Sequence, residues 1–203
     1  MTTATDGYPY KDRILNHFWS YTAEQRDLKF FAILDGARSE KIYPALKEYS
    51  VNHKCLLLSH KLLYGGQLPH VLAMAAPYLV ELRPGDLFTE WVVSRGWGNS
   101  WGIFFASNST FSILARHFRR FIMVKTEEGE KFYFRYYDPR VLRTYLPTCS
   151  RTELKFLFEE VRLFIAEEEG GRRMIEYYPS GDRFNTRFVR IEKEPATPDA
   201  GNA

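Results

Sequence analysis

The stretch from residue 131 to residue 144 constrains the fold of this chain more than any other. It reads Lys-Phe-Tyr-Phe-Arg-Tyr-Tyr-Asp-Pro-Arg-Val-Leu-Arg-Thr. Alternate side chains of a β-strand share a face, so a strand here places Phe132, Phe134 and Tyr136 on one side and Tyr133, Arg135 and Tyr137 on the other. Asp138 then stands at the N-cap of a helix whose first residue, Pro139, has no N–H that needs a partner. The sequence therefore predicts a strand that leads directly into a helix.

The rest of the chain alternates between helical and strand-like patterns, which predicts an α/β fold of the mixed α+β kind. Apolar residues at helical spacing or good N-caps, such as Asp86 before 87–94, predict helices over 8–20, 39–49, 87–94, 110–119, 139–145 and 152–158. Short apolar or alternating runs predict strands over 28–34, 55–58, 78–82, 102–106, 120–125, 131–137, 161–166, 172–178 and 184–191. Glycines and prolines predict irregular structure between residues 60 and 77.

These elements are expected to assemble into a two-lobed body with a mixed, partly antiparallel sheet and flanking helices. Residues 28–58 read as strand, helix and strand, which predicts a β-α-β unit with parallel strands. A break at Arg83-Pro84-Gly85 separates the possible lobes, and a groove between two lobes is a common binding site. The expected divisions are an N-terminal helical segment 1–27, a main domain 28–167 with possible lobes 28–85 and 86–167, C-terminal strands 168–194 and a flexible tail 195–203.

Composition limits the classes of protein to which the chain can belong. The formal net charge of +3 is too small to indicate nucleic acid or an anionic membrane as a partner. The aromatic content of 16% is high and suggests that some rings lie at an interface. The first residues carry no signal-peptide pattern, and no apolar run approaches the ~20 residues that span a bilayer. We therefore expect a cytoplasmic protein without a membrane partner, in which Cys55 and Cys149 are reduced.

No familiar enzyme signature occurs in the sequence, so we expect a protein that is not an enzyme and that uses no cofactor. Phosphate-binding loops, dinucleotide-binding glycines, the GxSxG elbow and HExxH are all missing. Cys55, His60 and His70 have spacings that match no common zinc arrangement, so no metal site is expected. Asp35 follows a strand and could serve as a general base, but the Gly36-Ala37-Arg38 sequence after it favours a turn-capping role.

Arginines and aromatic residues gather in two places along the second half of the chain. Arg135, Arg140 and Arg143 accompany Tyr133 and Tyr137, a mixture that would suit single-stranded nucleic acid. The same residue types dominate protein interfaces, and a third interpretation is that Asp138 caps a helix and pairs with an arginine. Near His117 lie Arg116, Arg119 and Arg120, which would bind phosphate or simply form a solvated helix face.

Trp97 and Trp101 form a second unusual patch, with glycines at 96, 98 and 102. The glycines permit a tight turn and a close approach of the backbone. Two tryptophans within five residues are more than a turn needs. They either fill the junction of the two lobes or anchor a partner.

Several segments, taken in order, resemble a known bacterial family, the type VI secretion effector chaperones or adaptors, long catalogued as a domain of unknown function. The resemblance spans roughly residues 28 to 165. The segments that carry it are Phe31-Ala32-Ile33-Leu34-Asp35-Gly36-Ala37, Gly96-Trp97-Gly98, Trp101-Gly102-Ile103-Phe104, His117-Phe118-Arg119-Arg120-Phe121 and Phe134-Arg135-Tyr136-Tyr137-Asp138-Pro139-Arg140-Val141-Leu142.

The resemblance implies a non-enzymatic adaptor that binds an effector protein, often by its N-terminal region, and loads it onto the valine-glycine-repeat (VgrG) spike protein. In this interpretation 28–167 is the adaptor domain, and aromatic and arginine side chains around the groove would bind the partner. The candidate partner-binding residues are Trp97, Trp101, Arg119, Arg120, Tyr133, Arg135, Tyr137, Asp138, Arg140 and Arg143. The alternatives are an immunity-type toxin-binding protein, an α/β enzyme and a nucleic-acid-binding module.

Overall fold

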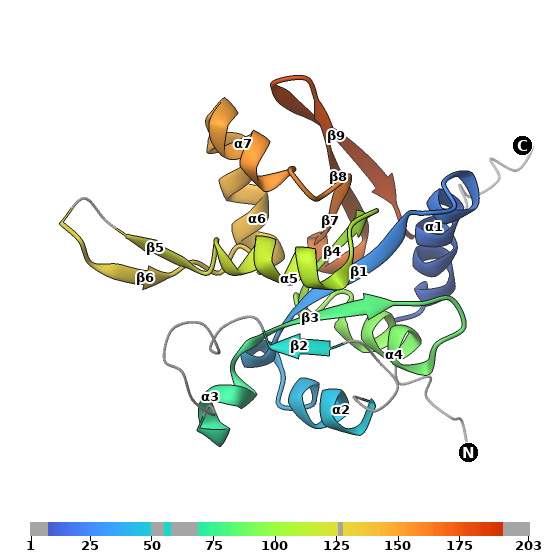
Figure 1. The fold of residues 1–203 in the computed structure, drawn as a ribbon. Coiled ribbons are helices and arrows are strands. Elements are labelled where there is room, and N and C mark those ends of the chain that lie inside the picture. The colour runs from blue at the N-terminus through green and yellow to red at the C-terminus, as the bar shows by residue number, and fades with distance from the viewer. Residues whose placement is uncertain (1–7, 50–54, 58–68, 126–127, 193–203) are drawn as a thin grey trace, which may run out of the picture.

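The computed structural model describes residues 8–49, 55–57, 69–125 and 128–192. Its centre is a seven-stranded sheet in the order β2-β3-β1-β4-β7-β8-β9 (Figure 1). The strands are β1 (Lys29–Asp35), β2 (Cys55–Leu57), β3 (Pro77–Leu82), β4 (Gly102–Ser107), β7 (Leu163–Glu168), β8 (Arg173–Ser180) and β9 (Arg183–Arg190). Every neighbouring pair in this sheet is antiparallel. A separate two-stranded hairpin consists of β5 (Met123–Lys125) and β6 (Lys131–Tyr133).

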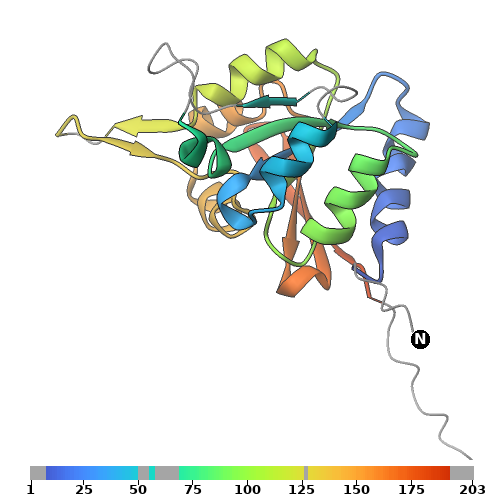
Figure 2. The ribbon, with the colours of Figure 1, turned by 90° about the horizontal axis from the view of Figure 1, so that it is seen from below.

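Helices cover both faces of the sheet. The seven α-helices of the described part are α1 (Lys11–Glu24), α2 (Ile42–Tyr49), α3 (His70–Met74), α4 (Leu87–Gly96), α5 (Phe111–Arg119), α6 (Pro139–Tyr145) and α7 (Arg151–Leu157). One core cluster joins α1, α2 and α4 to one face, and a second joins α5, α6 and α7 to the other. Figure 2 shows α5 on the opposite side of the sheet from α2 and α4. The prediction of a mixed α/β fold is confirmed.

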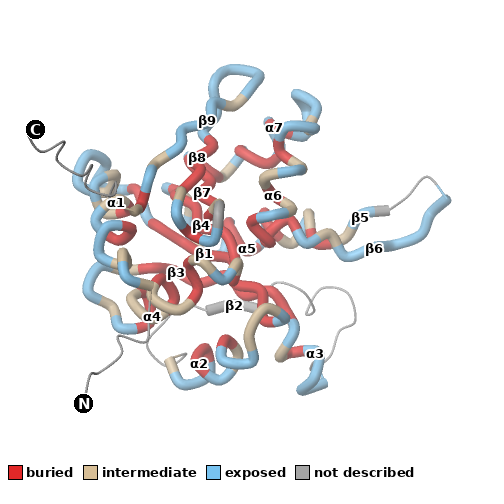
Figure 3. Tube along the Cα trace, turned by 180° about the vertical axis from the view of Figure 1, so that it is seen from behind, coloured by how far each residue is buried: buried red, intermediate tan, exposed pale blue. Residues whose placement is uncertain are grey.

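Strand β1 contributes to both clusters, because its sequence is apolar without interruption from Phe30 to Leu34. Phe30 and its alternate neighbours face the α1 side, while Phe31 and Ile33 face the α5 side. A strand covered on both faces needs no polar positions, which explains the continuous run before Asp35. The red core of Figure 3 follows this sheet.

The assembly of the expected β-α-β unit differs from the prediction. Strands β1 and β2 do point the same way, since each is antiparallel to β3, but β3 lies between them and they do not pair. The possible lobes 28–85 and 86–167 share one sheet, because β1 of the first pairs with β4 of the second. The stretch between residues 60 and 77, expected to be irregular, contains α3 and the first residue of β3. The proposed tail 195–203 and His60 lie outside the described residues.

The strand predicted for 131–137 ends early, so the prediction was wrong for residues 134–137. Strand β6 stops at Tyr133, after which Phe134 N donates to the carbonyl of Ile122 at 2.8 Å and Asp138 N donates to the carbonyl of Arg135 at 3.0 Å. The chain turns there, so Tyr136 and Tyr137 both enter the core instead of facing opposite sides. The helix that follows starts at Pro139, as predicted.

Within the described residues, the structure contains no helix with the length and apolar character needed to cross a membrane.

Candidate partner-binding surface

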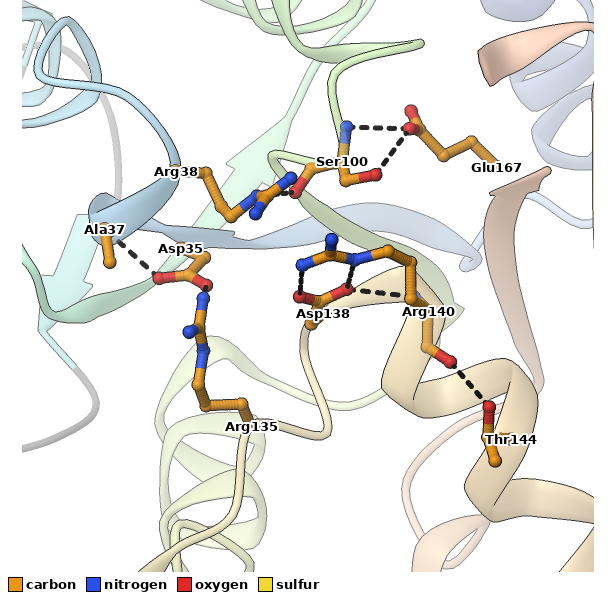
Figure 4. A network of polar contacts seen from close by, with 9 residues as sticks. All are labelled: Asp35, Ala37, Arg38, Ser100, Arg135, Asp138, Arg140, Thr144 and Glu167. Carbon is orange, nitrogen blue, oxygen red and sulfur yellow. Dashed lines mark hydrogen bonds and ion pairs between the residues drawn. The ribbon is translucent and has the colours of Figure 1, made fainter. Parts of the chain in front are cut away.

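A network of carboxylates and arginines lies where β1 ends and α6 begins (Figure 4). Asp35, the last residue of β1, is only 1% exposed. Its Oδ1 accepts a hydrogen bond from Ala37 N at 3.1 Å, and its Oδ2 accepts one from the Arg135 guanidinium. The turn-capping interpretation of Asp35 is therefore confirmed. The ion pair also fixes the base of the β5–β6 hairpin to the central strand, because Arg135 follows β6 directly.

Asp138 begins helix α6 and holds Arg140 beside it. Its Oδ1 accepts from Arg140 N at 2.9 Å, and its Oδ2 accepts from the Arg140 guanidinium at 2.6 Å. Burial raises the pKa of Asp138, but these hydrogen bonds to a cation outweigh it and hold the pKa below its usual value. The predicted cap is confirmed, and the side chain of Asp138 is already occupied within its own helix.

A third carboxylate, Glu167 on β7, organises the turn before β4. Its two oxygens accept from Gly98 N at 2.6 Å and from Ser100 N at 2.7 Å. Burial raises the pKa of Glu167 in spite of these bonds. The Arg143 guanidinium donates to the backbone carbonyl of the same glutamate. The arginine of α6 therefore ties that helix to the sheet.

Both tryptophans of the expected binding patch lie in the core. Trp97 is 1% exposed, and its indole N–H donates to the carbonyl of Gly171 at 2.8 Å. Trp101 is buried against Trp91, with ring centroids 5.1 Å apart. In this structure neither ring offers a surface to a partner. The expectation that they act as exposed anchors is corrected accordingly, and their role is packing.

Arg119 and Arg120, at the end of α5, lie apart from the network around Asp35. Arg120 donates to Nδ1 of His117 at 2.8 Å and to Glu159 at 2.6 Å, and its guanidinium covers the ring of Phe156 at 4.2 Å. These contacts join α5 to α7. Arg119 is half-buried.

Stability is expected to fall as the pH falls below about 6.5, because His117 is buried. Burial, followed by the charge of Arg120, lowers the pKa of His117 from its usual 6.5. Below that pH the unfolded chain takes up a proton that the folded chain resists, so unfolding is favoured until the folded pKa is passed. The slope is at most ~1.4 kcal/mol per pH unit. Urea unfolding between pH 7 and 5 should show this slope in the wild type and a flatter one in His117→Gln; equal slopes would contradict the prediction.

Next to Asp35 and Arg135 the structure contains a surface pocket of about 250 Å³. Leu72, Ala75 and Ala76 at and after α3 form one wall, and Tyr133 and Tyr137 form the other. Burial raises the pKa of Tyr137, so this phenol stays neutral. The pocket is therefore mainly apolar, with one ion pair at its inner side.

The β5–β6 hairpin beside this pocket extends away from the body of the molecule (Figures 1 and 3). Phe132 is 50% exposed and Tyr133 is 53% exposed, and on α3 Val71 is 76% and Leu72 48% exposed. Tyr133 faces the pocket together with Leu72, while Phe132 pairs with Val124 in the register of the hairpin. We call Val71, Leu72, Val124, Phe132 and Tyr133 the hairpin surface. Because successive residues of a strand face opposite sides, Tyr133 lies beside the pocket with Leu72, whereas Phe132 and Val124 lie on the other face of the hairpin. Exposed apolar groups on both faces of a protruding element are typical of a protein-binding site.

Of the ten predicted residues, the structure brings three to this pocket, namely Tyr133, Arg135 and Tyr137. Asp138 and Arg140 pair with each other in the polar network of Figure 4, and Arg143 donates to the carbonyl of Glu167, so none of the three lines the pocket. Sequence reasoning missed Val71 and Leu72, whose only signal was an apolar run between two prolines. Strand alternation put Phe132 on the face of Phe134 and Tyr136 and did not single it out as a binding residue. Among the residues weighed and rejected as metal ligands, His60 lies outside the described residues, and the described part contains no cluster of three potential metal ligands.

The model of the protein family described as "Domain of unknown function (DUF4123)" matches residues 30–155, which is more than half of the chain. The match runs from β1 into α7 and includes the whole hairpin surface. Searches among curated proteins and among solved structures found no match.

Proposed function

Because the chain belongs to the DUF4123 family, we propose that it is a non-enzymatic adaptor or chaperone of type VI secretion. It binds an effector protein in the cytoplasm and promotes loading of that effector onto the VgrG spike protein. The proposal combines the family membership with the resemblance of segments such as Phe134 to Leu142 to the effector chaperones.

The observation that carries the proposal is the hairpin surface. Phe132 and Tyr133 lie on an element that contributes little to the two core clusters, so their exposure is not a by-product of core packing. Tyr133 beside the apolar pocket and Phe132 on the other face of the hairpin are large rings of the kind that supply most of the energy in protein interfaces. An apolar or helical segment of the effector, near its N-terminus, would insert a side chain between Leu72 and Tyr133.

The ion pair at the pocket supports the same role. A protruding hairpin of three-residue strands is marginal by itself. The Asp35–Arg135 pair and the hydrogen bond from Phe134 N to the carbonyl of Ile122 hold its base in place. Holding the hairpin in one orientation before binding reduces the entropy that association would otherwise lose.

The double variant Phe132→Ser/Tyr133→Ser is expected to retain its effector at least tenfold less well than the wild type, because both anchoring rings are removed. The measurement is co-purification, from the bacterium that carries the gene, of effector candidates encoded near that gene, followed by titration of the purified pair. The matched control is Leu87→Ser/Ile113→Ser, which removes two exposed apolar side chains from α4 and α5.

Both variants should melt at the wild-type temperature, since the substituted residues are exposed. Unchanged retention of the toxin by a folded Phe132→Ser/Tyr133→Ser variant would exclude the hairpin surface as its binding site. In a strain from which the gene for this chain is deleted, absence of the toxin from the VgrG spike would support the proposed loading role. Neutralisation of the toxin by the purified chain would instead indicate an immunity protein.

A further inference from the structure

A second pocket, of about 360 Å³, lies beside the end of α1, where the chain crosses towards β1. Its lining includes Tyr21, Leu28, Arg162, Leu163, Tyr178 and Arg187. These residues come from α1 and the segment after it, from β8 and β9, and from the start of β7. In Figure 1 this region is on the opposite side of the molecule from the β5–β6 hairpin. The pocket is therefore separate from the hairpin surface.

The pocket contains two guanidinium groups and no carboxylate in its lining. Arg187 is already neutralised, because its Nε donates to the buried Glu176 Oε2 at 2.5 Å. Arg162 is different: its Nε donates to the neutral Asn108 Oδ1 at 3.1 Å, and it forms no ion pair with any residue that the structure describes. The pocket thus carries one positive charge without a counter-charge, which favours an anionic ligand.

The walls of the pocket add a requirement for an apolar group. Leu28 and Leu163 are buried beneath it, and the ring of Tyr178 is exposed beside it. A bare inorganic anion would leave these groups unused. A ligand with a carboxylate next to an apolar side chain would use both.

Strand β9 indicates that the ligand is a peptide. Among the described strands β9 pairs only with β8, so it is the edge of the sheet. Every second residue of an antiparallel edge strand directs its N–H and C=O groups outwards, where another strand can pair with them. All charged residues of β9 are arginines, at positions 183, 187 and 190. One of them, Arg187, also lines the pocket.

We propose that β9 and the adjoining pocket bind an extended acidic segment of a partner protein. The segment adds a strand to β9, and one of its acidic side chains extends over β9 towards the guanidinium groups of Arg187 and Arg162. This site does not depend on the adaptor role proposed above. In an adaptor, it would provide a second surface for a second partner.

The test uses two synthetic eight-residue peptides with blocked ends, one alternating Glu and Val and one alternating Lys and Val. Fluorescence anisotropy should show the Glu peptide binding the full chain at least tenfold more tightly than the Lys peptide. Arg162→Gln should weaken the Glu peptide about tenfold, the cost of one charge-assisted hydrogen bond. The matched control Arg116→Gln, an exposed arginine on α5, should change binding less than twofold. Equal binding of both peptides, or equal effects of the two variants, would overturn the proposal.

Backbone methylation separates strand addition from simple anion binding. In an extended peptide, the N–H groups of the Glu residues point to one side and those of the Val residues to the other. Methylation of one set should therefore abolish binding, whereas methylation of the other should leave it intact. If both methylated peptides bind like the parent, the pocket takes an anion without strand pairing and the proposal fails. The Phe132→Ser/Tyr133→Ser variant should bind the Glu peptide normally, so failure at the hairpin surface is distinguishable from failure here.

Discussion

Replacing Arg135 with alanine is expected to lower the free energy of unfolding by about 3 kcal/mol, measured by urea unfolding at pH 7. The reason is the partner that the substitution leaves behind. Asp35 is 1% exposed, and its carboxylate accepts from Ala37 N and from Arg135. Without Arg135, the hydrogen bond from Ala37 N is the one that remains of these two. A buried carboxylate without a cation is costly. Because Arg135 itself is half-exposed, water can reach the vacated site, which places the loss at the lower end for buried pairs.

A double-mutant cycle tests this cause. Asp35→Asn removes the charge that Arg135→Ala would strand, so the double variant should be more stable than the sum of the two single losses predicts. Additive losses would show that the pair is not coupled. Arg151→Ala provides the control, since Arg151 and its partner Asp182 are both 73% exposed and such pairs contribute less than about 1 kcal/mol.

The Arg135 substitution should also act on the hairpin surface. The pair connects the segment after β6 to the end of β1. Its loss should increase hydrogen exchange at residues 131–137 more than in the central sheet. Exchange that rises equally everywhere would indicate global destabilisation alone.

Replacing Glu176 with alanine is expected to cost about 4 kcal/mol, the largest effect of any substitution considered for this chain. The carboxylate is fully buried on β8. Its Oε1 accepts from His17 Nε2 at 2.6 Å and from the Tyr21 hydroxyl at 3.0 Å, and its Oε2 accepts from Arg187 Nε at 2.5 Å. The glutamate therefore holds α1 to the β8–β9 hairpin. The alanine variant loses these bonds and leaves a cavity as well.

Glu176 should also destabilise the protein as the pH falls, but hydrogen bonds lower its pKa, whereas burial lowers that of His117. Burial raises the pKa of Glu176, but the hydrogen bonds from His17 and Arg187 outweigh it and keep the pKa below 4.5. The contribution of Glu176 to stability is present above that value and is lost as the pH falls through the folded pKa.

The control for Glu176→Ala is Asp182→Ala, in the turn of the same hairpin, which should cost less than about 1 kcal/mol by urea unfolding. A comparable loss in both variants would contradict the role given to Glu176.

Local signals in the sequence predicted the individual elements well. Asp86 and Asp138 were expected to begin helices, and each accepts the expected backbone hydrogen bond, from Thr89 N and from Arg140 N. These signals hold because a cap and its helix lie within a few residues of each other. The strand predicted for 131–137 was wrong beyond Tyr133, since hydrogen bonding to Ile122 and a turn at Arg135 override the alternation of rings.

The candidate site could be predicted only in part. Tyr133, Arg135 and Tyr137 were singled out by residue type and do meet at one pocket. Trp97 and Trp101 were singled out by the same argument and are buried. The sequence does not distinguish the two groups, because exposure depends on neighbours supplied by distant segments. For Trp97 that neighbour is Gly171, which accepts its indole N–H.

The sequence by itself determined the kinds and order of most elements, with α3 missed and β6 predicted four residues too long. It also determined the helix starts at Asp86 and Asp138 and the segments by which the family is recognised. Each of these depends on residues close together in the chain. Only the tertiary structure decided that β3 lies between β1 and β2, that β9 is left as an open edge and that Phe132 and Tyr133 remain exposed. Backbone hydrogen bonds are the same for every pair of strands. Strand order, and with it the exposed surface, therefore depends on how the two helical layers pack against the whole sheet.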